Sequence, residues 1–275
     1  MDIYYVNSKG TKIYLDRYPY KALSDTSLFD YEWSFDTNNN MIRNIARSVK
    51  KGKIKIVVAG KTKEEYNENL TNLFECIETD ILNDSCGKLY VGDYYIYCYF
   101  YKNEKPDKVM NVKGTCIQLY VVAKSQAWTK ETIHQFHYSD DPKEDTPGKG
   151  YPYGYPYDYS PGSGHVATII NENITSCDFI MEISGYAFEP SISIGGHTYE
   201  VSVTVQENET LIIDSKNRTV ILQRANRIKE NIFYLRDRRS YIFEKIPSGE
   251  SLVYWAGNFN FKIKLIEERS EPLWT

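Results

Sequence analysis

The sequence predicts a mainly β protein in two parts, an N-terminal β-sandwich-like domain with one α-helix and a C-terminal β-sandwich or jelly roll. Three observations predict this. Short runs of alternating apolar and polar residues fill most of the 275-residue chain. A single segment has strong helical periodicity, and one polar segment rich in Pro and Gly separates the two halves. The 25 tyrosines agree, because Tyr favours half-buried sheet surfaces and interfaces.

The first half contains short strands up to about residue 35 and a β-branched strand over 53–60 that stops at Gly60. A helix follows directly. Thr62 and Glu65 have the spacing of a capping box, in which each satisfies a backbone N–H at the helix start. The helix should end near Asn83, and its apolar stripe comprises Tyr66, Leu70, Leu73, Ile77 and Ile81.

Strands are expected again over 88–101, with a tight turn at Gly92-Asp93, and over 113–123. The segment 36–53 is harder to interpret. It begins as a polar loop and ends with five basic residues, which is compatible with a short cationic helix or with a strand-loop arm. Such a charge run could touch an acidic partner, but it is usually a solvated face.

Residues 124–164 are polar, acidic in the middle, and rich in Pro and Gly, as domain linkers are. We therefore predict an N-terminal domain over 1–130, a connection over 131–164 and a C-terminal domain over 165–275. Within the connection, Tyr occupies every second position, which is compatible with an edge strand, a linker or an aromatic binding surface. These tyrosines are Tyr151, Tyr153, Tyr155, Tyr157 and Tyr159.

About seven short strands follow at regular spacing, which is typical of a sandwich or jelly roll. Gly195-Gly196 predicts a two-residue hairpin turn, because glycine tolerates the positive φ angles that such a turn needs. A second hairpin is expected about Ser215-Lys216-Asn217, and apolar residues alternate in the last long strand from Phe259 to Leu265.

The charge balance of 33 basic against 37 acidic residues argues against nucleic-acid binding across a broad surface, which needs a positive excess. The start of the sequence has no apolar run typical of a signal peptide, and no stretch of about 18 apolar residues occurs. We therefore expect a soluble protein made in a cytoplasm, without membrane contact. The five cysteines lack C-x-x-C spacing and are expected to be free thiols.

Motifs for phosphate binding and for a nucleophile elbow are absent. His134 and His137, followed by Asp140 and Asp141, have metal-ligand composition but lie in the linker-like segment, where solvated loop residues are the more common explanation. We expect no enzyme activity, no catalytic residues, no metal and no cofactor. A dense mixture of charge and apolar residues over 234–249 suggests an interface or an exposed loop with local salt bridges, and its arginines are Arg236, Arg238 and Arg239.

Long stretches of the sequence resemble the siphophage distal tail protein family. In the first half these are "KTKEEYNENLTNLFECIETDI" and "GKLYVGDYYIYCYF". In the second half they are "PSISIGGHTYEV", "LIIDSKNRTVIL" and "YIFEKIPSGESLVYWAGNFNFKIKLIEERSEPLW". The resemblance covers nearly the whole chain in the right order, which makes it more specific than any single motif.

The resemblance implies a structural hub of a phage tail tip, carried in the virion. Proteins of this family form hexameric rings through the N-terminal domain and lie between the tail tube and the tail-associated lysin or tail spike protein. Their galectin-like sandwich projects outwards and in some phages holds receptor-binding proteins. By this resemblance, residues 1 to about 130 would form the ring and residues from about 137 to 275 the galectin-like domain.

Sugar binding is the alternative function, since a sandwich with a Tyr row suits a carbohydrate-binding module that contacts host cell-wall polysaccharide. Galectins use an H-x-N-x-R strand and a W-x-x-E-x-R segment for this purpose. Neither occurs here, because Trp255 is followed by Ala256-Gly257-Asn258. We therefore interpret the Tyr row as a joint between domains, with alternate rings packed and the others exposed.

Overall fold

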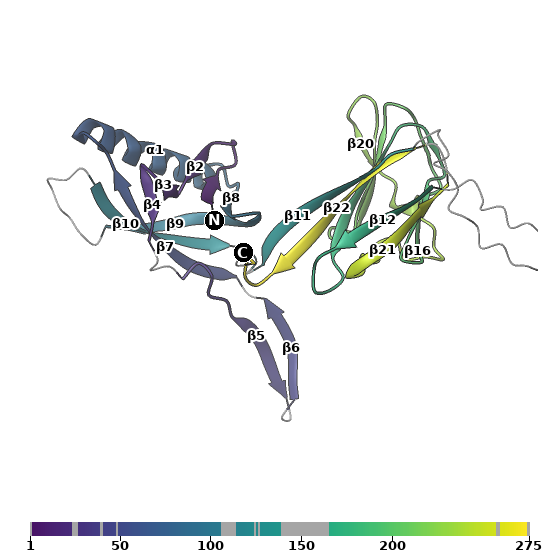
Figure 1. Cartoon of the computed structure of the whole chain (residues 1–275), viewed down its shortest axis with the longest axis horizontal. Coiled ribbons are helices and arrows are strands. Elements are labelled where there is room, and N and C mark those ends of the chain that lie inside the picture. Colours follow the sequence, from purple (N-terminus) through teal and green to yellow (C-terminus); the bar gives the residue numbers. More distant parts are fainter. Residues whose placement is uncertain are drawn as a thin grey trace, which may run out of the picture. The chain divides into compact units, whose positions relative to one another are not determined.

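The computed structural model describes residues 2–23, 27–38, 41–47, 49–105, 114–123, 125, 127–138, 165–256 and 259–273. The chain divides into two compact units. Unit 1 holds Met1–Lys130 and Glu268–Thr275, and unit 2 holds Glu131–Glu267. Both consist mainly of antiparallel strands, and the described residues contain one α-helix and one short 3₁₀ turn (Figure 1). The predicted mainly β fold with a single helix is confirmed.

Unit 1 is built on one antiparallel sheet. Its strands run in the order β3-β4-β7-β10-β9, after which β9 pairs with β8, β8 with β1, and β1 with β2. Alternate residues of each strand are buried, as a sheet with one covered face requires. The strands are β1 (Ile3–Val6), β2 (Lys12–Tyr14), β3 (Asp16–Arg17), β4 (Tyr20–Ala22), β7 (Lys50–Ala59), β8 (Gly87–Val91), β9 (Tyr94–Glu104) and β10 (Gly114–Ala123).

Helix α1 (Lys63–Leu82) covers one face of this sheet (Figure 1). Thr62 is its N-cap and accepts a hydrogen bond from the backbone N–H of Glu65, as the capping box predicts. Leu73 and Ile77 join the core of the unit, which also includes inward residues of β7, β8, β9 and β10. The predicted stripe is wrong at its last position, because Ile81 is 46% exposed and Asp80 takes the buried place.

Unit 2 is a β-sandwich. One sheet has the order β20-β19-β18-β13-β22-β11 and the other β12-β21-β15-β16, and inward residues of both form a single hydrophobic core. A short pair, β14 with β17, and a 3₁₀ turn, η1, complete the unit. The elements are β11 (Trp128–Phe136), β12 (His165–Asn171), β13 (Asp178–Ser184), β14 (Ala187–Phe188), β15 (Ser191–Ile194), β16 (His197–Glu200), β17 (Thr204–Val205), β18 (Thr210–Asp214), β19 (Thr219–Gln223), β20 (Lys229–Asn231), η1 (Phe233–Leu235), β21 (Gly249–Trp255) and β22 (Asn260–Arg269).

The predicted turns are confirmed. Gly195 and Gly196 join β15 to β16 with φ angles of 57° and 85°, in the left-handed region where glycine carries no steric cost. Residues 215–218 join β18 to β19, and Gly92-Asp93 joins β8 to β9. These turns depend on local chemistry, which explains why the sequence predicts them.

The structure divides the chain differently from the predicted segments at two places. Residues 128–136, polar enough to resemble a linker, form strand β11, and residues 268–275 belong to unit 1. Residues 139–164 lie outside the described residues, so a connection there stays a prediction. No helix in the described part of the chain is long and apolar enough to cross a bilayer.

Candidate functional site: an exposed apolar arm

A two-stranded hairpin, which we call the arm, projects from unit 1 (Figure 1). It consists of β5 (Trp33–Asn38) and β6 (Met41–Arg47). In the described part of the chain these two strands pair only with each other. The segment 36–53 therefore forms a strand-loop arm followed by the start of β7, and the helical alternative is wrong.

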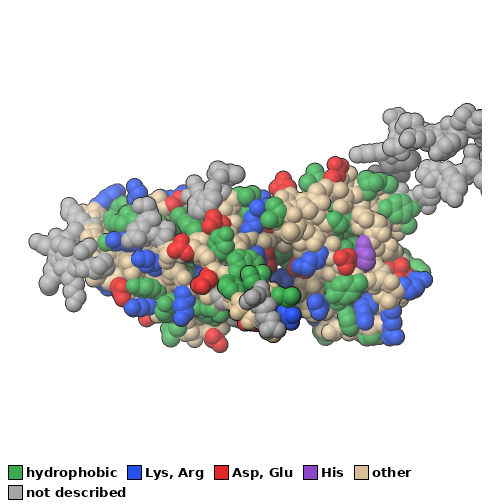
Figure 2. Space-filling model, turned by 90° about the horizontal axis from the view of Figure 1, so that it is seen from below, with side chains coloured by type: hydrophobic (Ala, Val, Ile, Leu, Met, Phe, Trp, Pro, Cys, Tyr) green, Lys and Arg blue, Asp and Glu red, His purple; other side chains and the backbone are tan. Residues whose placement is uncertain are grey.

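Large apolar side chains on the arm are exposed to solvent. Figure 2 looks towards the side to which the arm points in Figure 1, and hydrophobic side chains gather there. Ile42 and Ile45 are 64% and 63% exposed, which is far more than a core residue would tolerate. The large apolar residues of the arm with more than a third of their surface exposed are Trp33, Phe35, Met41, Ile42 and Ile45.

Local contacts hold the two strands in register. The Asn44 side chain donates a hydrogen bond to the Asp36 carboxylate at 2.9 Å, and Ser34 Oγ donates to the Ala46 carbonyl at 3.0 Å. The Arg47 guanidinium lies 5.0 Å from the Trp33 ring centroid, within cation–π range. The register shifts between Ser34 and Asp36, as at a β-bulge, and such bulges bend a hairpin.

Arg47 fixes the base of the arm. Its Nη1 lies 3.4 Å from Glu268 Oε2, in the C-terminal part of unit 1. Its Nε is buried and has no hydrogen-bond partner among the described residues. The ion pair with Glu268 therefore links the base of the arm to the C-terminal part of unit 1.

An isolated two-stranded hairpin is marginally stable in water, because it buries too little apolar surface to offset the entropy of ordering its chain. A contiguous exposed apolar surface usually marks a protein interaction site. The arrangement is therefore suited to docking against another protein. It carries no group of carboxylates, thiols or imidazoles that could perform chemistry among its described residues.

The basic residues of the same segment do not form one patch. Arg43 is exposed on the arm, Arg47 contacts Trp33 and Glu268, and Lys50 is only 3% exposed. The count of basic residues in this segment therefore did not predict its exposed apolar side chains. The run "MIRNIA" was the available signal, since four apolar residues on a short polar hairpin need a partner.

The predicted interface residues fall in two places. The row from Tyr151 to Tyr159 lies outside the described residues, so its role stays a prediction. Arg236 lies over the Phe233 ring at 3.7 Å and donates from Nη1 to the Phe233 carbonyl at 2.9 Å. Arg239 pairs with Asp237 at 3.2 Å. Arg238 is exposed, and all three arginines lie in unit 2.

His134, considered for metal binding, and Trp255, considered for sugar binding, both lie on strands of the structure. His134 lies on β11, and burial lowers its pKa from the ordinary value. Trp255, considered for sugar binding, is 3% exposed and packs edge-on against Phe261 at 5.1 Å between centroids. Its ring is thus part of the unit 2 core and presents no face to a ligand.

Comparison with known proteins defines the class of fold. No protein-family model matches the sequence, and no curated protein matches it. Solved structures do match, over nearly the whole chain. The fold of this chain is similar to that of phage distal tail and baseplate proteins. This similarity confirms the resemblance that the sequence suggested.

The structure of the SPP1 Dit protein, described as a paradigm of the hub adsorption apparatus in phages that infect Gram-positive hosts, aligns with a TM-score of 0.59 at 10% identity over 98% of each chain. A chain of the phage P2 baseplate in its activated conformation with Ca aligns with a TM-score of 0.55 at 12% identity, covering 98% of this chain and 99% of that one. The Sr form gives 0.55 at 13% identity with the same coverage.

Proposed function

We propose that this protein is the distal hub of a phage tail, a structural protein of the virion tail tip and not an enzyme. Unit 1 assembles into a hexameric ring, and the ring joins the tail tube to the tail-associated lysin or tail spike protein. Unit 2 is the galectin-like peripheral domain, which in this proposal offers a site for receptor-binding proteins. The exposed apolar arm is the observation that carries the proposal, because a monomer gains nothing from it.

The arm suits a ring for a physical reason. Identical subunits in a ring meet through two different surfaces, one supplied by each neighbour. An arm that extends from one subunit and packs on the next buries its apolar side chains and adds interface area. Obligate interfaces of this kind are large and apolar. The likeness to solved hub and baseplate structures over 98% of the chain supports the same role.

The proposal also gives roles to the tyrosine row and to the three arginines that the sequence singles out. The tyrosines from Tyr151 to Tyr159 connect the ring to the peripheral domain and pack alternate rings on unit 2 or on a neighbouring subunit. Arg236, Arg238 and Arg239 lie on unit 2 and supply planar donors to a docked partner.

The test is the mass of the purified chain. Light scattering should give a particle of about six times the 32.0 kDa monomer, and negative-stain images should show rings. Ile42→Asp and Ile45→Asp should each shift the particle to monomer, because burying a carboxylate in an apolar interface is costly. Ile228→Asp in unit 2, at a residue 62% exposed, is the matched control and should leave the ring intact.

Two results would contradict the proposal. One is a wild-type chain that stays monomeric at high concentration, both alone and with its tube protein. The other is an arm variant that forms rings as well as the Ile228→Asp control does. Circular dichroism of each variant checks that the fold has survived.

A carbohydrate-binding role for unit 2 is the second candidate. Exposed aromatic rings favour it, since Phe188 and Tyr234 are 67% and 63% exposed. Titrating host cell-wall polysaccharide against tryptophan fluorescence should give a saturable change if this role exists. A flat titration, or an affinity unchanged in Phe188→Ala, Tyr234→Ala and a variant with Tyr153, Tyr155 and Tyr157 replaced by Ala, would remove the candidate.

A further inference from the structure

The outer face of the unit 1 sheet, opposite α1, carries a row of four tyrosines whose neighbouring rings are in contact. Tyr14, Tyr4, Tyr90 and Tyr95 lie at directly opposite register positions on β2, β1, β8 and β9. The Tyr4 and Tyr90 rings stack at 4.5 Å with an interplanar angle of 11°. Lys12 Nζ lies 3.6 Å from the Tyr4 centroid, so an ammonium group already covers part of this row.

The same face is strongly basic. The outward-facing residues of β2, β3, β4, β7, β8 and β9 include seven lysines, one aspartate and one glutamate among the described residues. We call this surface, with its tyrosines, the Tyr/Lys face. Tyr97 and Tyr101 on it are 46% and 49% exposed. Its charged residues on these strands are Lys12, Asp16, Lys21, Lys51, Lys53, Lys55, Lys88, Lys102 and Glu104.

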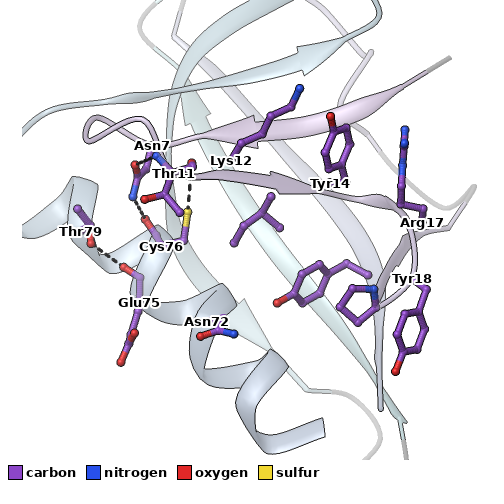
Figure 3. Close-up of a pocket in the computed structure, with 13 residues that line it drawn as sticks. Asn7, Thr11, Lys12, Tyr14, Arg17, Tyr18, Asn72, Glu75, Cys76 and Thr79 are labelled. Atoms are coloured by element: carbon purple, nitrogen blue, oxygen red, sulfur yellow. Dashed lines mark hydrogen bonds between the residues drawn. The ribbon is translucent and has the colours of Figure 1, made fainter. Parts of the chain in front are cut away.

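The opposite side of unit 1 is acidic. Helix α1 presents exposed carboxylates at Glu64, Glu68, Glu75 and Glu78, against one exposed lysine, Lys63. Figure 3 shows the two sides together, with Lys12, Tyr14 and Arg17 pointing away from the helix that carries Glu75. Lys12 and Glu75 also line one pocket, so the two surfaces meet at that edge of the unit. Away from this edge, the Tyr/Lys face and α1 lie on opposite faces of the sheet and carry opposite charge.

The C-terminal half of α1 has features of an interface. Its last turn contains no basic residue, although the helix dipole is negative there and cations would be stabilising. Leu82 is 81% exposed and Ile81 46% exposed, next to the acidic row. An apolar centre with a charged rim is the usual composition of a protein–protein contact.

We propose that the acidic face of α1 in one copy of this chain docks on the Tyr/Lys face of the next copy, so that charge pairing sets the head-to-tail orientation of the subunits in the ring. The inference rests on the proposed ring and names its partner surfaces. Because the two faces lie on opposite sides of one unit, each subunit uses one face for each neighbour, and the contact is head-to-tail. Charge complementarity of this kind directs association and fixes register.

A nucleic acid is the other polyanion that a basic aromatic face could bind. The stacking argues against it, because bases need free ring faces. Here the Tyr4 ring already stacks on the Tyr90 ring, and the Lys12 ammonium group lies over the Tyr4 ring. Carboxylates need only ammonium groups, and seven lysines lie on this face.

Charge reversal tests the pairing. One variant carries Lys12→Glu and Lys88→Glu, and a second carries Glu75→Lys and Glu78→Lys. Each alone should weaken ring assembly at least tenfold in light scattering at moderate salt. Mixing the two variants should restore rings, because each subunit then meets an opposite charge on both sides, and a chain with all four changes should also assemble. Arg227→Glu with Lys229→Glu in unit 2 is the charge-matched control and should assemble as wild type does.

The outcomes separate this inference from the ring itself. Wild-type rings with either reversal variant unaffected would overturn the pairing and leave the ring standing. Loss of rings without rescue in the mixture or in the fourfold variant would also overturn it. A wild-type chain without rings would contradict both proposals. Fluorescence anisotropy with a 30-base-pair DNA duplex is the last arm, and DNA binding that is lost in the lysine variant while rings persist would assign the face to nucleic acid instead.

Discussion

The Tyr5 hydroxyl donates a hydrogen bond to the carboxylate of Asp80, which is fully buried on α1. Asp80 also accepts from the Ser8 backbone N–H at 2.7 Å. Burial, with the hydrogen bond to Asp80 as the second cause, raises the pKa of Tyr5 far above its usual value, so the hydroxyl keeps its proton at any physiological pH. The pair ties the first strand to the helix across 75 residues of sequence.

Removing the Tyr5 hydroxyl should destabilise unit 1. Tyr5→Phe leaves a buried carboxylate short of one donor, which should lower the free energy of unfolding by about 1–3 kcal/mol. Tyr20→Phe is the matched control, because its hydroxyl donates to the neutral Asn69 carbonyl, and it should cost less, about 1 kcal/mol. Urea unfolding measures both, and equal losses would contradict the prediction.

Gly87 should not accept a side chain. A Cβ there would lie 2.3 Å from Tyr5 Oη and 2.5 Å from Asp80 Oδ2, closer than real contacts allow. We expect Gly87→Ala to cost on the order of 2 kcal/mol. In the Tyr5→Phe background the same change should cost less, because one clashing atom is gone. Strictly additive losses in the double-mutant cycle would show that Gly87 acts independently of the pair.

Lys50 should make stability depend on pH. It is 3% exposed, its Nζ has no hydrogen-bond partner in the described structure, and burial lowers the pKa of Lys50 to about 8. Between pH 8 and the unfolded value near 10.4, the unfolded chain binds more protons here than the folded chain does, so this residue's destabilising effect fades as pH rises. Below pH 8 the effect is complete.

Lys50→Met should therefore stabilise the protein at pH 7, by on the order of 2 kcal/mol. The gain should shrink by pH 9.5, in thermal unfolding followed at both pH values. Lys51→Met, at the exposed neighbouring position, is the control and should change little at either pH. A gain from Lys50→Met that is the same at pH 7 and pH 9.5 would contradict the pKa assignment.

The buried hydrogen bonds of Asn171 should stabilise unit 2. It is 3% exposed, and its Nδ2 donates to the carbonyls of Ile246 and Pro247 at 3.1 and 2.9 Å. Its Oδ1 accepts from the Asn173 backbone N–H at 3.1 Å. Asn171→Leu should cost about 2–3 kcal/mol by leaving these buried groups unpaired. Asn226→Leu, in an exposed turn, should cost under about 1 kcal/mol, and similar midpoints for the two variants would refute the assignment.

Local chemistry explains what the sequence predicted well. The Thr62 cap, the glycine turn at 195–196 and the alternation in β7 and β10 depend on neighbours a few residues away, and all are present. The strand over 128–136 was missed because its polar residues resemble a loop. Pairing with a neighbouring strand, rather than local propensity, makes it a strand.

The sequence by itself determined the fold class, the position of the helix and a likeness to phage tail hubs that the fold then confirmed. Only the tertiary structure decided which side chains are buried and which face solvent. Asp80 is buried because Tyr5 and Ser8, more than 70 residues away, supply its donors, while Ile42 and Ile45 remain exposed because no described strand packs on the arm. Hydrophobicity gives the tendency of a residue to be buried, but the partner that buries it is a property of the folded chain or of its neighbours in an assembly.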